Sequence, residues 1–381
     1  MYVKIYQSIT EIPESAWDAI VGPNRLICTH RFLEAVEKSE INDCRFYYPV
    51  VYDDAGKIIA HTCVYTISTE LDTFAQGVVK KFIIAIRKIW KNFLIMRSLE
   101  CGTPVALGNT ISVGEEKNFD ALFDAIIQGI DNLSVELKIN MILIRDFYHD
   151  ELDRFDRCQS RGYLRIHNLP TADFKIEWEK FEDYLAALRT AYRTEIKGNM
   201  KKKNKEGVTI VTEKNFSVYA QDMEQLWNNT YTRAKEYKRE RLTEKFFRNF
   251  GEYLGEKTAA IFFKKNEQLI GFFLLFFNNE TLILSYCGLD YKYNKDYFIY
   301  YNLFYHLIRL GIDRRMKNIS LGITTLYSKK AIGGQVKKLY MYMKYRKVLW
   351  RYIVPRFFDM MTPQDNVERR NVFRRTGVYA N

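Results

Sequence analysis

The stretch YYNLFYHLIRLGIDRRMKNISLG, from Tyr300 to Gly322, decides the fold of this chain. It begins with an apolar segment of helical character and ends with a short apolar segment that predicts a strand. Three more apolar segments precede it, AAIFF, LIGFFLLFF and TLILSYCGL, and they predict antiparallel strands. Strands that precede helices in this mixed order indicate an α+β (mixed α/β) protein rather than a regular doubly wound sheet.

The first half of the chain shows the same order of segments. Val50–Ile67 and Ile261–Asn278 each read as strand, polar turn and strand, at an offset of 211 residues (261 − 50). The tripeptide GID ends a predicted helix at Gly129 and again at Gly311, at an offset of 182 (311 − 129). The difference of 29 residues (211 − 182) matches an insertion at 71–99. Two copies of one unit are therefore predicted, and chance similarity of common patterns is the alternative.

Length and repeat together predict two domains and a tail. A chain of 381 residues is long for one domain, and the repeat places the boundary near residues 169–170. The expected ranges are 1–169 for the first domain, which carries the insertion 71–99, then 170–355 for the second domain and 356–381 for the tail.

The composition favours a folded protein with anionic partners. Lysine and arginine number 58 against 46 acidic residues, and the net charge of +12 attracts phosphates, nucleic acid, acidic carrier proteins or lipid headgroups. The six cysteines and five histidines show no metal-ligand spacing, so no metal site is expected. The chain has neither a signal peptide nor a long apolar span, which predicts a cytoplasmic protein.

Short motifs exclude several classes of enzyme. The stretch SLGITTLYSKKAIGG is rich in glycine and lysine, but Lys329 follows Gly322 by seven residues with no second glycine between them. It is therefore not a standard phosphate loop, and no dinucleotide-binding fingerprint occurs elsewhere. The serine-hydrolase elbow and the H-E-x-x-H motif are absent as well.

The second half resembles the FemAB-like branch of the GNAT acyltransferase superfamily, which is associated with peptidoglycan biosynthesis or recognition. Two tyrosines open a helix, a glycine closes it, and a strand ending in glycine follows, then a basic residue and another glycine. Those positions are Tyr300, Tyr301, Gly311, Gly322, Lys329 or Lys330, and Gly333 or Gly334. The segments SAWDAI, THRFLEAVEKS and YYPVVYDDAGKIIA are also similar to this family, so the resemblance covers roughly residues 5–350. It departs at Tyr305, where the family carries a carboxylate, and in a longer loop before the lysines.

The resemblance implies two tandem GNAT-like domains, each a mixed, mainly antiparallel sheet flanked by helices. It also implies transfer of an acyl group from acyl-CoA or an acyl-carrier protein to an amine of a lipid or cell-envelope precursor, with no tightly bound cofactor. One alternative is an aminoacyl-tRNA-dependent transferase that extends a peptidoglycan peptide; the lack of a helical-arm insertion counts against it. Another is a non-catalytic recognition or membrane-adaptor protein. DNA is not an expected partner.

Side chains around the third strand and the helix after it are the candidates for the site. A base must take the amine proton, and backbone N–H groups at a splay or bulge of the third strand would hold the oxyanion. The expected catalytic residues are Asp290, Tyr286, Tyr301 and His306. The expected substrate-binding residues are Tyr293, Tyr300, Asn302, Tyr327, Lys329 and Lys330. The alternative is that the tyrosines only pack, Asp290 only turns the chain, and Cys287 is a small core residue.

A basic stripe marks the start of the second domain. One helix is predicted over 181–205, with cations four residues apart at Arg189, Arg193, Lys197 and Lys201. Like charges at this spacing repel one another, so an anionic partner would stabilise the helix. We expect these residues to bind the donor, and a solvated helix face is the alternative.

The insertion 71–99 predicts contact with a membrane. Residues 78–97 alternate apolar and cationic residues at helical spacing without an acidic residue, as in helices that lie in a membrane interface. Residues 338–358 have a similar composition. The protein is thus expected to associate peripherally with the inner membrane face, and a helix packed on the first domain is the alternative.

Overall fold

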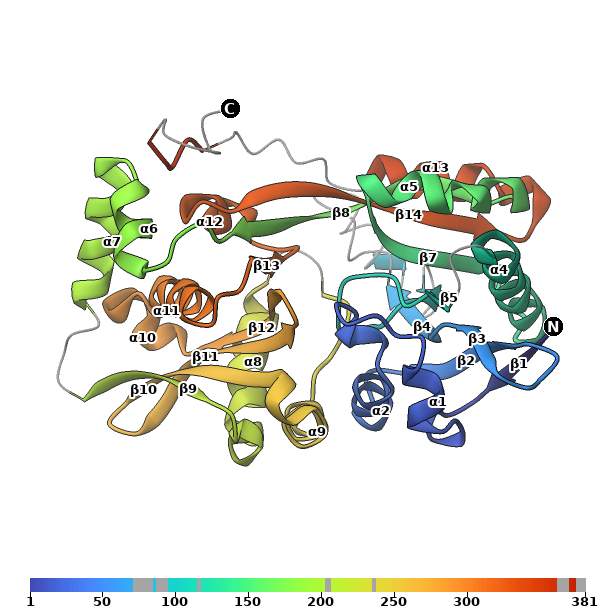
Figure 1. The fold of residues 1–381 in the computed structure, drawn as a ribbon. Helices are drawn as coiled ribbons and strands as arrows, with labels where there is room; N and C mark the ends of the chain where they lie inside the picture. The colour runs from blue at the N-terminus through green and yellow to red at the C-terminus, as the bar shows by residue number, and fades with distance from the viewer. Residues whose placement is uncertain are drawn as a thin grey trace. The chain divides into compact units, whose positions relative to one another are not determined.

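The computed structural model describes residues 1–70, 85–86, 95–114, 118–202, 207–234, 238–361 and 370–374 (Figure 1). The chain forms two compact units. Unit 1 contains residues 1–169, 235–241 and 338–364, and unit 2 contains residues 170–234, 242–337 and 365–381.

Unit 2 is built on a mixed sheet with the strand order β8-β13-β12-β11-β10-β9. All neighbouring strands are antiparallel except β12 and β13, which are parallel. Its strands are β8 (Leu164–Lys175), β9 (Val208–Glu213), β10 (Thr258–Lys265), β11 (Gln268–Asn278), β12 (Thr281–Leu289) and β13 (Asn318–Gly322). Its helices are α6 (Phe181–Ala187), α7 (Thr190–Lys202), α8 (Ala220–Arg233), α9 (Glu244–Leu254), α10 (Tyr291–Tyr297), α11 (Ile299–Asp313) and α12 (Leu326–Ala331).

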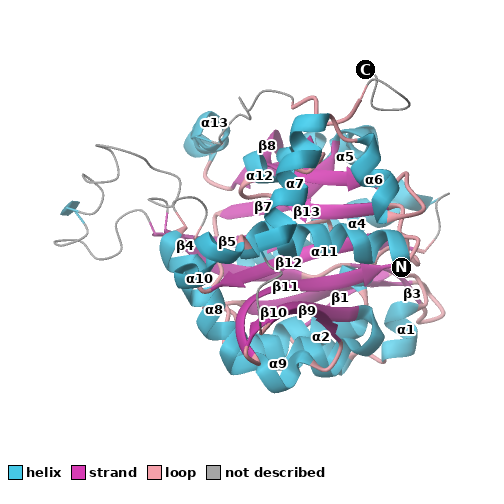
Figure 2. Ribbon diagram, turned by 90° about the vertical axis from the view of Figure 1, so that its left-hand side faces the viewer, coloured by secondary structure: helices cyan, strands magenta, loops and turns pink. Residues whose placement is uncertain are grey.

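Helices cover both faces of this sheet, as Figure 2 shows for α11 in front of the strands. The central strand β11 is buried from Leu269 to Phe277, the pattern of a strand covered on both faces. On one face, α9 contacts the strands through Phe246 and Phe247. On the other, α11 lies so close to the sheet that a Cβ at Gly311 would be 2.8 Å from a methyl of Ile176, just after β8, and 3.1 Å from a methyl of Ile319 on β13. The glycine of the GID motif is therefore required for helix–sheet contact.

Unit 1 repeats the arrangement. Antiparallel strands β2, β4 and β5 precede a parallel pair, β5 and β7, and β14 pairs antiparallel with β7. Its strands are β1 (Tyr2–Tyr6), β2 (Arg45–Tyr52), β3 (Ile58–His61), β4 (Val64–Glu70), β5 (Ile95–Cys101), β6 (Ser112–Val113), β7 (Met141–Tyr148) and β14 (Gln335–Tyr345). Its helices are α1 (Glu14–Asp18), α2 (His30–Lys38), α4 (Phe119–Glu136), α5 (Leu152–Phe155) and α13 (Ile353–Met361). The predicted mixed, mainly antiparallel sheets flanked by helices are confirmed in both units.

The last strand of each copy completes the sheet of the other copy. Strand β8 follows the first copy in the chain, yet Ala172–Lys175 pair with β13 in unit 2. Strand β14 follows the second copy, and Leu339–Tyr345 pair with β7 in unit 1. The predicted range 170–355 therefore differs from unit 2, because 338–355 and 235–241 cluster with unit 1. The predicted tail, 356–381, is also split between the units: residues 356–364 belong to unit 1 and residues 365–381 to unit 2, where Phe373 pairs with Leu188.

Three helical predictions need correction. The GID tripeptide does not end the helix of unit 1, because α4 continues from Gly129 to Glu136. The helix predicted over 181–205 is two helices, because Leu188 adopts an extended conformation and pairs with Phe373. Within the predicted insertion 71–99, residues 95–99 are part of strand β5, which pairs with β4. Most of the proposed membrane segment, 78–97, lies outside the described residues.

Candidate active site

The parallel strands β12 and β13 separate after a short paired region. Thr281–Ile283 pair with Asn318–Ser320, and no pairing continues beyond them. At the same level β12 carries a bulge: Leu284 and Tyr286 face successive residues of β11, and Ser285 between them has no partner there. A bulge leaves backbone groups free of the ladder. The splay thus offers N–H donors of the kind that can hold a developing oxyanion.

The bulge residue also brings an unsatisfied hydroxyl. Ser285 Oγ is buried, and no hydrogen-bond partner for it occurs in the described part of the chain. Buried polar atoms are nearly always paired, so such an atom marks a place where a ligand or water can bind.

Helix α12 brings Lys329 to this splay. The side chain is 3% exposed, and Nζ lies 3.7 Å from the position that a Cβ would take at Gly322, the last residue of β13. The same position is 3.7 Å from the carbonyl oxygen of Leu284 on β12. Gly322 has φ of +79°, so the backbone there would be strained by any side chain. Lys329 Nζ therefore lies close to the ends of the paired regions of both strands.

Burial makes Lys329 chemically unusual. Loss of hydration lowers the pKa of Lys329 to about 7, and no hydrogen bond to its Nζ occurs among the described residues. A lysine with such a pKa is largely neutral slightly above pH 7, and a neutral amine can accept a proton. Lys330 is also buried, at 6% exposed, so both lysines of the motif turn inward.

Cys287 is the second titratable group near the splay. Burial raises the pKa of its thiol to about 11, and the nearby Lys329 charge opposes that rise. Cys287 lies two residues beyond the bulge and packs against the same core as Tyr300 and Leu326. The thiol is therefore protonated at neutral pH, and it lines the site as a small, polarisable group.

Tyr300 and Tyr301 hold α12 in place. The Tyr300 hydroxyl lies 2.7 Å from Thr325 Oγ1, and the Tyr301 hydroxyl lies 3.4 Å from Ser328 Oγ. Burial is the main cause that raises the pKa of Tyr300 well above its ordinary value. Thr325, just before α12, has the left-handed φ of +53°. The paired tyrosines thus position the turn from which Lys329 enters the splay.

Comparisons with known proteins agree with this architecture. The profile of the FemAB-like family, described as peptidoglycan biosynthesis/recognition, matches residues 8–333. The chain belongs to the FemAB-like family. Among solved structures, FemX superposes with a TM-score of 0.55 at 12% identity, over 92% of this chain and 99% of FemX. The C-terminal domain of a putative lysylphosphatidylglycerol synthetase from Agrobacterium fabrum gives 0.51 at 11% identity, over 88% and 92% of the two chains.

A curated relative of the FemAB-like chain is the putative 8-amino-7-oxononanoate synthase 2 of Mycobacterium tuberculosis. The two are 24% identical over 309 residues, which is 80% of this chain and 40% of the relative. The chain thus matches about two fifths of that protein's length. Family membership places the chain among proteins of peptidoglycan biosynthesis or recognition, and the solved structures agree in fold.

The other predicted catalytic residues of the FemAB-like chain lie in different surroundings. Asp290 is the N-cap of α10, where its Oδ1 accepts a hydrogen bond from the N–H of Lys292 at 2.9 Å. Tyr286 packs edge-to-face on Phe246 of α9, on the opposite face of the sheet from α11. His306 Nε2 lies 3.1 Å from Thr212 Oγ1 on β9, and β10 and β11 lie between that strand and the splay.

The remaining predicted substrate-binding residues are also dispersed. Asn302 is 2% exposed, and its Nδ2 donates to the carbonyl oxygens of Asn199, Tyr297 and Phe298, which joins α7, α10 and α11. Tyr293 lies beneath Lys265, 4.9 Å from its Nζ. Tyr327 is exposed and carries the Arg370 guanidinium over its ring.

The predicted donor-binding cations do not form one stripe. Arg189 lies between α6 and α7, and its Nε donates to the carbonyl oxygen of Phe373 at 3.2 Å. Arg193 is partly buried on α7, whereas Lys197 and Lys201 are exposed on that helix. The break at Leu188 rotates Arg189 out of register with the other three.

The corresponding parallel strands of unit 1 are β5 and β7, and a buried cluster of charged side chains lies beside them. Glu100 on β5 accepts from Arg145 at 3.0 Å, from Tyr65 at 2.8 Å and from Ser98 at 2.7 Å. Arg239 reaches the same carboxylate at 2.5 Å, and its side chain is 7% exposed. Although burial opposes ionisation, the two guanidinium groups hold the pKa of Glu100 at about 2. A satisfied cluster of this kind leaves no free base, in contrast to Lys329.

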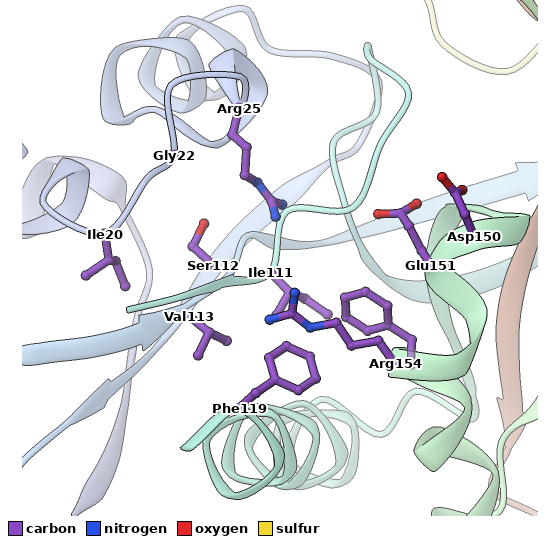
Figure 3. Close-up of a pocket in the computed structure, with 11 residues that line it drawn as sticks. Ile20, Gly22, Arg25, Ile111, Ser112, Val113, Phe119, Asp150, Glu151 and Arg154 are labelled. Atoms are coloured by element: carbon purple, nitrogen blue, oxygen red, sulfur yellow. The ribbon is translucent and has the colours of Figure 1, made fainter. Parts of the chain in front are cut away.

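Unit 1 also contains a cavity of about 380 Å³ between α4, α5 and the segment before α2 (Figure 3). Arg154 extends into it with its guanidinium 3.7 Å from the ring centre of Phe119. Burial raises the pKa of Glu151 at its rim. Sequence analysis missed these residues, because they come from separate segments with no motif.

Neither a metal site nor a membrane-spanning helix occurs in the described part of the chain. Among the described residues, no group of three or more His, Cys, Asp or Glu side chains could hold a metal ion. Within the same residues, no helix is long and apolar enough to cross a bilayer. Sequence analysis identified Lys329 but not Ser285, whose signal is a single hydroxyl in an apolar strand.

Proposed function

We propose that the protein is an N-acyltransferase that moves an acyl group from acyl-CoA or an acyl-carrier thioester to an amine of a lipid or cell-envelope precursor. The observation that carries the proposal is the burial of Lys329 at the splay of β12 and β13. Burial lowers the pKa of this lysine to about 7, so its amine can be neutral at physiological pH. In this role Lys329 is the general base, and the splay holds the thioester carbonyl.

The proposed reaction needs one base and an oxyanion site. The acceptor amine attacks the thioester carbonyl carbon, and Lys329 takes the proton that the nitrogen loses. Backbone N–H groups beside Ser285 stabilise the oxyanion. The carbon–sulfur bond then breaks, and the ammonium of Lys329 returns its proton to the departing thiolate. The products are an amide and a free thiol, and Lys329 regains its starting state.

The alternatives use the same site differently. An aminoacyl-tRNA-dependent transferase would bring an ester rather than a thioester, and an adaptor would bind without turnover. The buried amine favours an enzyme, because burying a lysine costs stability that a purely structural site has no reason to retain.

The proposal is tested by thiol release. Acetyl-CoA and palmitoyl-CoA are each mixed with phosphatidylethanolamine or with a lysine-containing peptidoglycan peptide, and the CoA thiol is detected spectrophotometrically. We expect turnover with at least one pair, and Lys329→Met should lower kcat by about 10²- to 10⁴-fold. Lys338→Met, an exposed lysine on β14, is the matched control and should keep full activity.

Binding data separate the hypotheses. Calorimetry with acyl-CoA, acyl-carrier protein and aminoacyl-tRNA identifies the donor. Affinity for aminoacyl-tRNA alone would support the peptidyl-transfer alternative. Absence of affinity for all three donors would refute both enzymatic hypotheses.

A further inference from the structure

Unit 1 exposes an apolar segment that follows β14 and continues into the first turn of α13. Val348 is 73% exposed, Leu349 84%, Trp350 51%, Tyr352 59% and Ile353 58%. Five large apolar side chains within six residues are thus exposed, and such a concentration of exposed apolar residues usually marks a binding surface. We call Lys347–Arg356 the apolar loop.

Contacts on its C-terminal side attach the apolar loop to unit 1; Figure 1 labels the helix α13, into which it continues. On its C-terminal side, Val354 and Phe358 pack into a core cluster with Met341 and Met343 of β14. At the next residue, Asp359 Oδ1 accepts from the backbone N–H of His167 at 2.7 Å. The exposed side chains therefore extend from an anchored segment, so little ordering is needed when they bind.

All charged residues of the sequence within the apolar loop and just before it are basic. Between Lys337 and Asp359 the sequence contains six lysines and arginines and no acidic residue. Lys344 and Arg346 are engaged, with Asp131 Oδ2 at 2.8 Å and the carbonyl oxygen of Ser134 at 3.1 Å respectively. Lys347 and Arg356 are exposed at the two ends of the loop, with no ion pair among the described residues.

We propose that the apolar loop inserts into the surface of an anionic lipid bilayer. Leucine, isoleucine and valine would enter the acyl boundary, while Trp350 and Tyr352 would lie at the headgroup level, where aromatic side chains with a polar edge are favoured. Lys347 and Arg356 would meet the lipid phosphates. Residues 338–358 contain no acidic residue, which favours an anionic lipid surface over a protein partner. A protein interface normally offers complementary charges of both signs.

This surface differs from the segment 78–97 that the sequence singled out, and it does not depend on the proposed catalysis. The test is co-sedimentation of the full chain with vesicles of phosphatidylcholine and phosphatidylglycerol in equal parts, and with phosphatidylcholine alone. The double substitution Leu349→Glu with Ile353→Glu removes the apolar contact. Val218→Glu, at a residue 69% exposed in unit 2, is the matched control.

We expect the wild type and Val218→Glu to bind anionic vesicles equally, and the double variant to bind at least about tenfold more weakly. Lys347→Gln and Arg356→Gln should each weaken binding to anionic vesicles about fivefold, without effect on neutral ones. Circular dichroism verifies that each variant is folded. Full vesicle binding by the double variant would overturn the proposal. So would a wild type that binds no vesicles but forms a dimer that the double variant disrupts, because the loop would then bind a second copy.

Discussion

Replacement of Lys329 by methionine should stabilise the protein while it abolishes activity. Methionine has nearly the same length and no charge, so it fills the splay without the cost of a buried ammonium. Lys329 is 3% exposed, so the whole electrostatic penalty falls on the folded state.

The magnitude follows from the difference between two pKa values. An ordinary lysine has a pKa of 10.5, and burial lowers the pKa of Lys329 to about 7. Below pH 7 both the folded and the unfolded chain carry the proton, and the penalty is fully present. Between pH 7 and 10.5 the unfolded chain binds more protons, so stability rises with pH. The penalty is then about 4 kcal/mol at pH 7 and about 2 kcal/mol at pH 9.

Urea denaturation of the wild type and Lys329→Met at pH 7, 8 and 9 measures this difference. The variant should be more stable by about 4 kcal/mol at pH 7, and its advantage should shrink by roughly 1 kcal/mol per pH unit. Lys338→Met should match the wild type at every pH. An advantage for Lys329→Met that stays constant from pH 7 to pH 9 would refute the assignment of a lowered pKa to Lys329.

Three further predictions concern the same architecture. Gly311→Ala should destabilise the protein by about 1–3 kcal/mol in thermal melts, because its Cβ would lie 2.8 Å from a methyl of Ile176. Gly198→Ala, in an open position on α7, should instead stabilise by about 0.5–1 kcal/mol, and equal effects would contradict the close approach of α11. Arg239→Met should destabilise by about 3–5 kcal/mol in urea, because the Glu100 carboxylate loses one of its two cations; a neutral effect would show that the cluster is not tightly coupled. Finally, kcat/KM for thiol release should rise with pH and level off above about pH 7 as Lys329 loses its proton, and a flat profile from pH 6 to 8 would exclude Lys329 as the base.

The sequence predicted the repeat and the fold class because both depend on local patterns. The helices that contain GID and the apolar strands recur at fixed offsets. In unit 2 GID ends α11, where Gly311 lies in close contact with its neighbours, whereas in unit 1 α4 continues beyond it to Glu136. The break at Leu188 was missed because its cause is Phe373, a residue 185 positions away (373 − 188). The exchange of β8 and β14 was missed for the same reason. The partner of a strand depends on residues far away in the sequence, and the strand's own residues do not reveal it.

The candidate site was predicted in part. Lys329 was identified from its place after a glycine-ended strand, but its burial depends on the separation of β12 and β13, which no local pattern encodes. Asp290 and Asn302 carry the residue types that catalysis uses, yet the structure employs them as a helix cap and a helix junction. Asp and Asn favour both kinds of role, so composition alone does not separate them.

The exchanged strands have a consequence for how the chain can be divided. A fragment ending at residue 169 would lack β14, so the edge of β7 would be open, and it would lack Arg239, so Glu100 would keep one cation fewer. A fragment beginning at residue 170 would lack the first part of β8. Neither half should be obtainable as a well-behaved protein by itself. Co-expressed from separate genes, the two should recover each other's strands, which makes this chain a natural candidate for a split reporter.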